Sequence, residues 1–127
     1  MSETRLVKEI LLDLGNEPDL ILWRNNTGKL ADVNGRWVTY GLAVGSSDII
    51  GVLAPWGRLF CLEPKATHSD TCKCKSCSAQ RDWGIAVTLM GGYYERVRSV
   101  DDARLALRTA REWARTFGAP TLSNTSA

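Results

Sequence analysis

Long apolar runs are missing from this chain of 127 residues, and the longest falls far short of the roughly 20 residues that a membrane span needs. We also expect no secretory signal, because the sequence opens on the polar segment Met-Ser-Glu-Thr-Arg. The sequence shows no internal repeat. Its composition is not that of a disordered chain, since 44% of the residues are apolar and 24% are charged. We therefore expect one globular domain in the cytoplasm, with no membrane partner.

The sequence has no marked excess of charge of either sign, because 16 basic and 14 acidic residues give a net charge of +2. This balance neither requires nor excludes binding to nucleic acid. Lysine is scarce, however: the chain has 5 lysines and 11 arginines, and arginine is better suited to bidentate contacts with phosphate. The composition therefore leaves a nucleic-acid partner open.

Apolar periodicity and turn residues predict an α/β domain in the order helix, four strands, helix, strand, helix. The helices are expected over 3–15, 78–90 and 100–117, and the strands over 20–25, 36–40, 49–53, 58–65 and 93–98. The sheet is expected to be mixed and flanked by helices. We place the domain at 1–117, with a cysteine-rich loop at 66–77, and expect a flexible C-terminal tail at 118–127.

The strands on either side of Pro55-Trp56-Gly57 bring candidate catalytic residues together. In a hairpin centred near Trp56, facing residues have numbers that add up to about 112, which places Asp48 beside Glu63 at the end away from the turn. Glu63 and Lys65 are two residues apart and point to the same face. Paired carboxylates together with water are the ligands that Mg²⁺ takes in phosphate chemistry. The alternative is an ordinary salt bridge of Lys65 at a solvated strand end.

Several short motifs resemble those of one nuclease superfamily. Gly45-Ser46-Ser47-Asp48, Glu63-Pro64-Lys65 and Gln80 in a following helix resemble the PD-(D/E)XK nucleases, and more narrowly the VRR-NUC domain in the stand-alone form found in phages. Further motifs that resemble this domain occur in the expected order: Trp23-Arg24-Asn25-Asn26-Thr27-Gly28, Tyr40-Gly41-Leu42, Gly57-Arg58-Leu59-Phe60, Gly91-Gly92 and Val97-Arg98-Ser99. The resemblance covers roughly residues 3–104, which is most of the chain.

The resemblance implies a restriction-endonuclease-like fold and a DNA endonuclease that hydrolyses phosphodiester bonds with Mg²⁺ or Mn²⁺. In that family the aspartate and the glutamate bind the metal, so these roles fall to Asp48 and Glu63. Lys65 would assist the attacking water, and Gln80 would belong to the same catalytic set. The alternative for Gln80 is a surface residue of its helix.

A glutamate of the first helix lies near the metal in the family, and Glu3 matches it as a third metal-binding residue. Glu3 also lies on the same helical face as Leu6 and Ile10, so its side chain is expected to point inward. Glu9 is the second choice, but helix geometry directs it away from that face.

The resemblance further implies a homodimer that cleaves branched DNA, such as a four-way (Holliday) junction, and a location in the host cytoplasm if a phage encodes the chain. The residues expected to contact DNA are Arg24, Asn25, Ser46, Ser47, Arg98, Arg104 and Arg108. Two alternatives stay open: a nicking or flap nuclease, and a non-catalytic DNA-binding module stabilised by zinc.

A few positions depart from the family pattern. Pro64 stands between Glu63 and Lys65, where the family usually has an apolar residue with an amide, and the proline predicts a strand end or a bulge. This departure affects the direction of the Lys65 side chain more than its identity. Ser99 replaces the third residue of the Val-Arg-Arg motif that names the domain, so Arg98 alone remains of its two arginines.

The cysteine-rich loop is another departure. His68, Cys72, Cys74 and Cys77 supply four soft ligands within ten residues, and Zn²⁺ takes four such ligands tetrahedrally. Cys61 is an alternative to His68 as the fourth ligand. The cysteines are expected to be reduced, so a structural metal or buried thiols are favoured over disulfides. The remaining alternative is a reduced, solvent-facing loop without metal.

The last helix carries four arginines on one stripe, because they are spaced by four, three and four residues. They are Arg104, Arg108, Arg111 and Arg115. Such a run is more often a solvated helix face, and the alternative is a ridge that contacts DNA phosphates.

Overall fold

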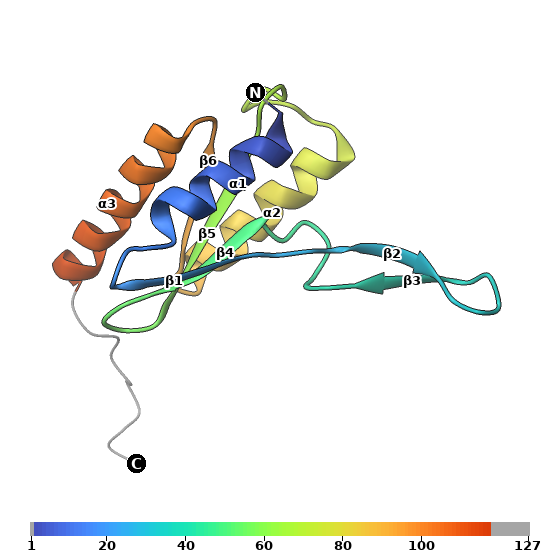
Figure 1. Cartoon of the computed structure of the whole chain (residues 1–127), viewed down its shortest axis with the longest axis horizontal. Helices are drawn as coiled ribbons and strands as arrows, with labels where there is room; N and C mark the ends of the chain where they lie inside the picture. Colours follow the sequence, from blue (N-terminus) through green and yellow to red (C-terminus); the bar gives the residue numbers. More distant parts are fainter. Residues whose placement is uncertain (1, 118–127) are drawn as a thin grey trace, which may run out of the picture.

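The computed structural model describes residues 2–117, which form three helices and six strands (Figure 1). They are α1 (Glu3–Leu14), β1 (Leu20–Arg24), β2 (Gly28–Ala31), β3 (Trp37–Tyr40), β4 (Ile49–Leu53), β5 (Arg58–Pro64), α2 (Lys75–Leu89), β6 (Tyr93–Val97) and α3 (Val100–Phe117). Over this part of the chain, none of the helices combines the length and the apolar character that crossing a bilayer requires. The tail predicted at 118–127 lies outside the described residues.

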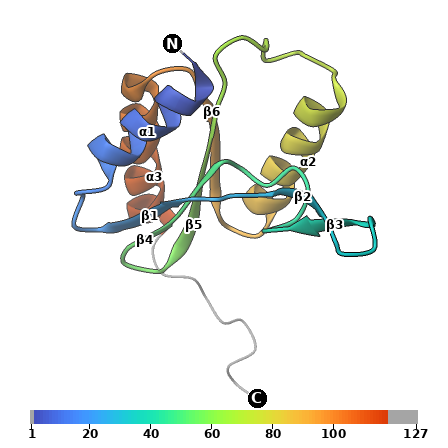
Figure 2. The same cartoon turned by 45° about the vertical axis from the view of Figure 1, so that its right-hand side comes forward.

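Four strands form the central sheet in the order β1-β4-β5-β6. β4 is antiparallel to both β1 and β5, whereas β6 runs parallel to β5, so the sheet is mixed. Helices α1 and α3 cover one face and α2 covers the other (Figure 2). The two parallel strands are joined through α2, because parallel neighbours require a long crossover connection. The predicted α/β class with a mixed sheet is therefore confirmed.

The two faces of the sheet carry separate apolar cores, because side chains alternate along each strand. The larger core packs α1 and α3 on the sheet and includes Leu6, Ile10, Ile49, Phe60, Leu62, Val97 and Leu107. The smaller core, beneath α2, consists of Ile50, Cys61 and Val87, with Leu59, Trp83 and Tyr94 packed against it. Asp48 comes two residues before Ile50, and Glu63 comes two residues after Cys61. Both acidic residues therefore belong to the α2 face.

Helix α1 begins where the sequence supplies a cap. Ser2 stands at the N-cap position, and its hydroxyl oxygen accepts a hydrogen bond from the backbone N–H of Arg5 (3.2 Å). The helix buries Leu6, Ile10 and Leu14, which the predicted periodicity places on one face, and also buries Val7. The cap thereby fixes Glu3 in the first turn, near the residue that follows Lys65 at the end of β5.

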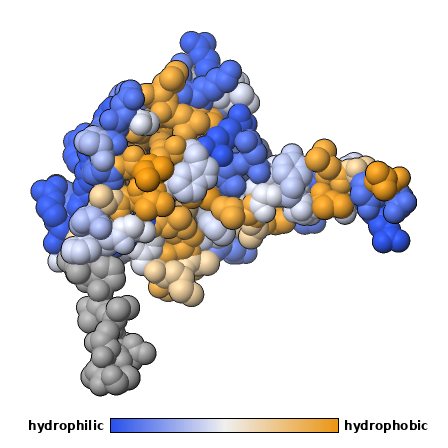
Figure 3. Space-filling model, turned by 60° about the horizontal axis from the view of Figure 1, so that its bottom comes forward, coloured by the Kyte–Doolittle hydropathy of each residue, from blue (hydrophilic) through white to orange (hydrophobic). Residues whose placement is uncertain are grey.

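The predicted strand at 36–40 does not belong to the central sheet, which corrects the expected topology. It forms β3, which pairs with β2 in a separate hairpin, and the sequence pattern did not predict β2. This hairpin, residues 28–40, projects from the body as an arm with apolar side chains along it (Figure 1 and Figure 3). The exposed apolar residues of the arm and of the segment after it are Leu30, Val33, Trp37, Val38, Tyr40, Leu42 and Val44. A strand with both faces exposed lacks the apolar–polar alternation by which a strand is recognised.

Helix α2 begins at Lys75 and not at residue 78 as predicted. The cause is an unusual cap, because the Sγ atom of Cys74 accepts a hydrogen bond from the backbone N–H of Cys77 (3.4 Å). Capping residues are usually Ser, Thr, Asp or Asn, so this helix start has no ordinary signal in the sequence. The cap links the start of α2 directly to the cysteine-rich loop.

Candidate functional site

Asp48 and Glu63 face each other at the end of the β4–β5 hairpin. The observed register pairs Ile49 with Leu62, and continuing it by one residue places Asp48 opposite Glu63. The backbone N–H of Asp48 donates a hydrogen bond to Oε2 of Glu63 (3.0 Å). The structure therefore brings together the two acidic residues that the hairpin symmetry predicts as neighbours.

The environment of these two carboxyl groups disfavours their charged forms. Burial and, next, the Asp48 carboxylate raise the pKa of Glu63 to about 8, although the Asp48 N–H and Lys65 act in the opposite direction. Burial also raises the pKa of Asp48, and the Lys65 ammonium opposes this effect. The Glu3 carboxylate adds to the rise in the pKa of Asp48, whereas the Arg24 guanidinium lowers it. A cation bound here would offset the repulsion between the carboxylates.

Glu63 keeps one carboxylate oxygen available for a ligand. The residue is 0% exposed, and its Oε1 atom has no hydrogen-bond partner among the described residues. A buried oxygen without a partner is energetically costly, and a bound cation supplies the missing partner. Oε1 of Glu63 therefore fits the role of a metal ligand.

The oxygen atoms of Glu3, Asp48 and Glu63 do not form a close group of three ligand atoms. Within residues 2–117, the close group of three or more His, Cys, Asp or Glu ligand atoms lies in the cysteine-rich loop and includes none of Glu3, Asp48 and Glu63. Mg²⁺ usually keeps several waters and takes only one or two protein carboxylates. The all-oxygen set around Glu63 therefore suits a hydrated Mg²⁺ or Mn²⁺ ion.

Helix α1 brings Glu3, and not Glu9, to this end of the sheet. Oε1 of Glu3 accepts a hydrogen bond from the backbone N–H of Ala66 (3.3 Å), which directly follows Lys65. Glu9 instead forms an ion pair with Arg5 on an exposed part of the helix (3.1 Å). The second choice for the acidic residue of the first helix is therefore wrong, and Glu3 lies where the helix geometry predicts.

Pro64 ends β5, as its missing amide predicts. It is the last residue of the strand and pairs with Val97 of β6. The backbone N–H of Lys65 then donates to the carbonyl oxygen of Val97 (2.9 Å), so the chain still follows β6 beyond the proline. Lys65 is only 6% exposed, and its ammonium group acts on the pKa of both Asp48 and Glu63. The strand end is therefore buried, and not solvated as the salt-bridge alternative had assumed.

Gln80 is partly buried on α2, and its Oε1 atom has no hydrogen-bond partner within the described part of the chain. The turn that carries it contacts the loop before Asp48 through Gly45. Gly45 has a φ angle of +87°, and a Cβ atom there would lie 2.5 Å from the carbonyl oxygen of Ala79. Glycine therefore allows this loop to approach the helix next to Gln80.

Three residues that were expected to contact DNA take part in an internal hydrogen-bond network. Nδ2 of Asn25 donates to Oγ of Ser46 (2.8 Å) and to the carbonyl oxygen of Ser47 (2.9 Å). Nε1 of Trp83 donates to Oγ of Ser47 (3.2 Å). Both serines are buried. The network positions the loop that leads into Asp48, which is a role that the sequence pattern did not show.

Arg24 and Arg98, also expected to contact DNA, lie in different surroundings. Arg24 is exposed at the end of β1, close enough to Asp48 to lower the pKa of its carboxyl group. Arg98 donates from its guanidinium group to the carbonyl oxygens of Lys65 (3.5 Å) and His68. Arg24 is thus directed to solvent beside the carboxylates, whereas Arg98 holds the start of the cysteine-rich loop.

The cysteine-rich loop gathers four ligand atoms into a tight cluster. One atom each from His68, Cys72, Cys74 and Cys77 lies within 4.8 Å of the others, so the cluster can hold a metal ion such as zinc. A hydrogen bond from the Cys77 N–H is the largest of the effects that lower the pKa of the Cys74 thiol to about 6. Cys61 lies in the smaller core and not in this cluster, so it is wrong as the alternative fourth ligand.

Two arginines that the sequence pattern did not single out hold the same loop. Nη2 of Arg96 donates to Sγ of Cys77 (3.3 Å). Arg81 donates from Nη2 to the carbonyl oxygen of Cys72. Their spacing is the signal that could have identified them, because Arg81 comes one helical turn after Cys77 and Arg96 shares a strand face with Arg98.

Two arginines of the predicted stripe are engaged inside the molecule. Arg104 forms ion pairs with Asp13 (2.6 Å) and Glu17 (2.8 Å). Arg111 forms ion pairs with Glu17 (3.0 Å) and Asp19 (2.7 Å). These contacts join α3 to the segment between α1 and β1. The exposed members of the stripe are Arg108 and Arg115. Neither of the two interpretations therefore describes the whole stripe.

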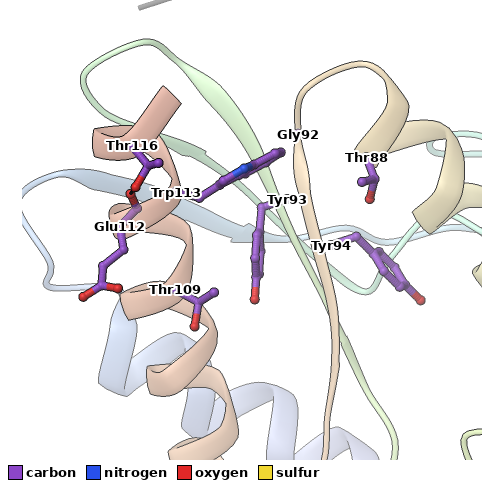
Figure 4. A pocket seen from close by; sticks show the side chains of 8 residues that line it. All are labelled: Thr88, Gly92, Tyr93, Tyr94, Thr109, Glu112, Trp113 and Thr116. Carbon is purple, nitrogen blue, oxygen red and sulfur yellow. Dashed lines mark hydrogen bonds between the residues drawn. The ribbon is translucent and has the colours of Figure 1, made fainter. Parts of the chain in front are cut away.

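A separate pocket lies between α2, β6 and α3, and none of the candidate catalytic residues lines it. Tyr93 from β6 and Trp113 from α3 contribute aromatic rings to it (Figure 4). The ring of Tyr93 also stacks on Phe60 of the larger core, with centroids 5.7 Å apart. The pocket is therefore an extension of the apolar packing and brings no further catalytic group to the candidate site.

Comparisons with known proteins add no relative to these observations. The sequence matches no family model, and no curated protein matches it. The resemblance to the VRR-NUC domain therefore stays a prediction, and the arrangement of the residues carries the functional interpretation.

Proposed function

We propose that the chain is a metal-dependent DNA endonuclease of the VRR-NUC type, with its active site at the end of the β4–β5 hairpin. The decisive support is the fully buried Glu63 carboxyl group, which faces Asp48 and keeps an oxygen that has no hydrogen-bond partner within residues 2–117. Stability alone explains this arrangement poorly, because each buried charge costs free energy and the two acidic residues repel each other. Carboxyl groups with such perturbed pKa values are typical of functional sites.

Asp48 and Glu63 would hold the divalent cation, and Glu3 would lie beside it. Bound Mg²⁺ or Mn²⁺ supplies Lewis-acid polarisation of the phosphate and makes a water more acidic. Lys65 is buried beside both carboxylates, where its ammonium group can donate hydrogen bonds to an attacking water or to a phosphate oxygen. The Asp48 N–H holds Oε2 of Glu63 and thereby fixes the direction of Oε1.

DNA would approach this end of the sheet from the side of Arg24, which is exposed close to Asp48 and can contact a neighbouring phosphate. Branched DNA, such as a four-way junction, is the substrate that we propose from the resemblance. Two cuts across a junction require two active sites, which a homodimer of this 14.0 kDa chain would provide. A nicking or flap nuclease would need only one.

A cleavage assay on a panel of substrates tests the function. Linear duplex, flapped duplex and four-way junction DNA are each incubated with the protein in Mg²⁺, in Mn²⁺, or without added divalent cation. We expect cleavage only with Mg²⁺ or Mn²⁺, fastest on the junction. Faster cleavage of flaps, or cleavage of one strand only, would show that the chain is a flap or nicking nuclease. Binding without cleavage under every condition would overturn the proposal and favour a non-catalytic DNA-binding module.

A further inference from the structure

We propose that His68, Cys72, Cys74 and Cys77 bind one Zn²⁺ ion in a tetrahedral site that fixes the connection between β5 and α2. This metal site is separate from the carboxylates around Glu63. Zinc binding here is independent of the proposed nuclease activity, so each can be tested without the other.

The positions of the four ligand atoms agree with a zinc tetrahedron. Nδ1 of His68 lies 3.4 Å from Sγ of Cys72, 3.5 Å from Sγ of Cys77 and 3.7 Å from Sγ of Cys74. Zinc bonds of about 2.3 Å to sulfur and about 2.0–2.1 Å to nitrogen place tetrahedral ligands about 3.6 Å apart for N···S and about 3.8 Å apart for S···S. The three N···S distances match the first value, and all separations within the cluster stay within 4.8 Å.

Hydrogen bonding alone does not explain this arrangement. A ring nitrogen of neutral histidine either donates or accepts through its single in-plane position, yet three sulfur atoms surround the same Nδ1 atom of His68. The three sulfurs are free thiols in the structure, and an odd number of cysteines cannot all pair as disulfides within the cluster. Coordination to a common ion accounts for all four groups at once.

The surroundings of the cluster compensate the negative charge of three thiolates. The backbone N–H of Cys77 donates to Sγ of Cys74 (3.4 Å), and the Arg96 guanidinium donates to Sγ of Cys77 (3.3 Å). Zinc, three thiolates and a neutral histidine carry a net charge of −1, which the single positive charge of Arg96 balances. Hydrogen bonds to the sulfur atoms are typical of metal sites, because they hold the ligands in place.

The ligands span the chain from the end of β5 to the first turn of α2. His68 comes three residues after Lys65, and Cys77 comes three residues before Gln80. Residues 66–74 form no helix or strand, and hydrogen bonds from Arg81 and Arg98 are among the contacts that hold their backbone. A zinc ion would therefore fix the length and the path of this connection. Its effect on the placement of Lys65 relative to α2 matters for catalysis only if the proposed function is correct.

Metal analysis of the full wild-type chain, purified without added zinc, is the first test. We expect about one zinc per chain, as in other structural sites with four Cys and His ligands. Replacement by Co²⁺ should give the intense visible bands of tetrahedral cobalt and a thiolate-to-cobalt charge-transfer band. Less than about a tenth of a zinc per chain, together with a Co²⁺ titration that produces neither band, would overturn the site.

Two cysteine variants identify the ligands. Cys72→Ser removes one proposed ligand, whereas Cys61→Ser changes a cysteine outside the cluster and serves as the matched control. We expect the zinc content to fall in Cys72→Ser and to stay near one per chain in Cys61→Ser. Equal loss in both variants would contradict the assignment, and the Co²⁺ titration of the wild-type chain decides the question if Cys72→Ser does not fold.

Amide hydrogen exchange tests the consequence for the fold. Zinc-loaded protein should show slower exchange over residues 66–80 than metal-free protein, with little change in the larger core. Equal exchange in the two forms would overturn the role of zinc in fixing this connection. Since none of these readouts measures cleavage, failure of the zinc site is distinguishable from failure of the proposed nuclease.

Discussion

The Glu63 carboxyl group has lost its contact with water, lies beside a second acidic residue and keeps one oxygen to which no described residue donates a hydrogen bond. Each of these conditions disfavours a bare negative charge, so a proton or a metal cation is needed to stabilise the group. Protons and metal ions therefore compete for the same carboxylate. Lys65 reduces the repulsion only in part, because the pKa of Glu63 stays at about 8 despite the nearby ammonium group.

The pH dependence of stability tests this environment. The pKa of Glu63 is about 8 in the folded chain, compared with its ordinary value of 4.5, so the folded state holds a proton that the unfolded chain releases. The free energy of unfolding should therefore fall as the pH rises from about 4.5 through about 8 in the absence of Mg²⁺ and Mn²⁺. Glu63→Gln should remove the contribution of Glu63 to this dependence and raise the melting temperature at pH 8 while changing it little at pH 5. Thermal melts of both proteins without added divalent cation measure the effect, and a lower melting temperature of the variant at pH 8 would contradict it.

The two acidic residues of α1 offer a matched comparison. Glu3 lies beside the candidate metal site, whereas Glu9 is paired with Arg5 on an exposed part of the helix. Glu3→Gln should weaken Mn²⁺ binding by about tenfold, as removal of a group next to a metal usually does, and Glu9→Gln should leave it within about twofold. Calorimetric titration with Mn²⁺ measures both affinities. The reverse order would show that α1 presents a different face to the site.

At the level of helices and strands, a contact can be predicted from the sequence when its residues lie close together in the chain. The β4–β5 hairpin is joined by a short turn, so counting outward from Trp56 was enough to pair Asp48 with Glu63. The partners of Arg104 lie far away in the chain, and Asp13 comes 91 residues earlier. No local pattern shows such a pairing, so a stripe that looks solvated or suited to DNA contains structural ion pairs.

The start of α2 and the strand β2 of the arm are two other features that the sequence pattern did not predict. A cysteine caps α2, although this residue type is a poor cap in general, and it belongs to the cluster that could hold a metal ion. The strands of the arm pair only with each other, and their side chains are almost all exposed. Both features depend on local hydrogen bonds that apolar periodicity does not show, whereas the buried strands and the face of α1 followed from periodicity.

The ion pairs between α3 and the α1–β1 segment give a prediction at this scale. Hydrogen bonds from Arg104 and Arg111 lower the pKa values of Asp13, Glu17 and Asp19. The stability from these contacts is therefore present above the ordinary carboxyl pKa and is lost as the pH falls through the lowered values. Arg111→Ala should lower the melting temperature at pH 7 by about 2–6 °C, and the difference should shrink in acid.

Arg108→Ala is the matched control for this prediction, because Arg108 is an exposed arginine on the same helix. Its melting temperature should equal that of the wild type. Equal melting temperatures of all three proteins at pH 7 would show that the ion pairs add nothing to stability.

The whole molecule combines a three-layer body with a projecting arm, and the arm carries an unusual amount of exposed apolar surface (Figure 3). Contiguous exposed apolar surface is typical of sites of association. The cluster of His68, Cys72, Cys74 and Cys77 lies outside the arm, in the connection between β5 and α2. Assembly and chemistry would thus use different parts of the chain.

The expected homodimer should be held by apolar contacts and persist at high salt. Light scattering should give twice the mass of the 14.0 kDa chain at both low and high ionic strength. Leu30 and Val38 are paired in the arm, and the double variant Leu30→Thr and Val38→Thr keeps residues that favour strands while reducing apolar surface. Loss of the dimer in this variant would place the interface on the arm. A monomeric wild type at micromolar concentration would contradict paired cutting of junctions.

The most direct measurement of the central claim is the rate of Mg²⁺-dependent cleavage by wild type, Asp48→Asn and Glu9→Gln. Asp48→Asn keeps the size of the side chain and leaves the backbone N–H that holds Glu63, while it removes the charge and replaces one carboxylate oxygen with an amide NH2 group. We expect the rate of Asp48→Asn to fall by at least about 100-fold while Glu9→Gln cleaves like the wild type. Circular dichroism should show that all three proteins are folded. Cleavage by Asp48→Asn at the wild-type rate would contradict the placement of the active site at the end of the β4–β5 hairpin.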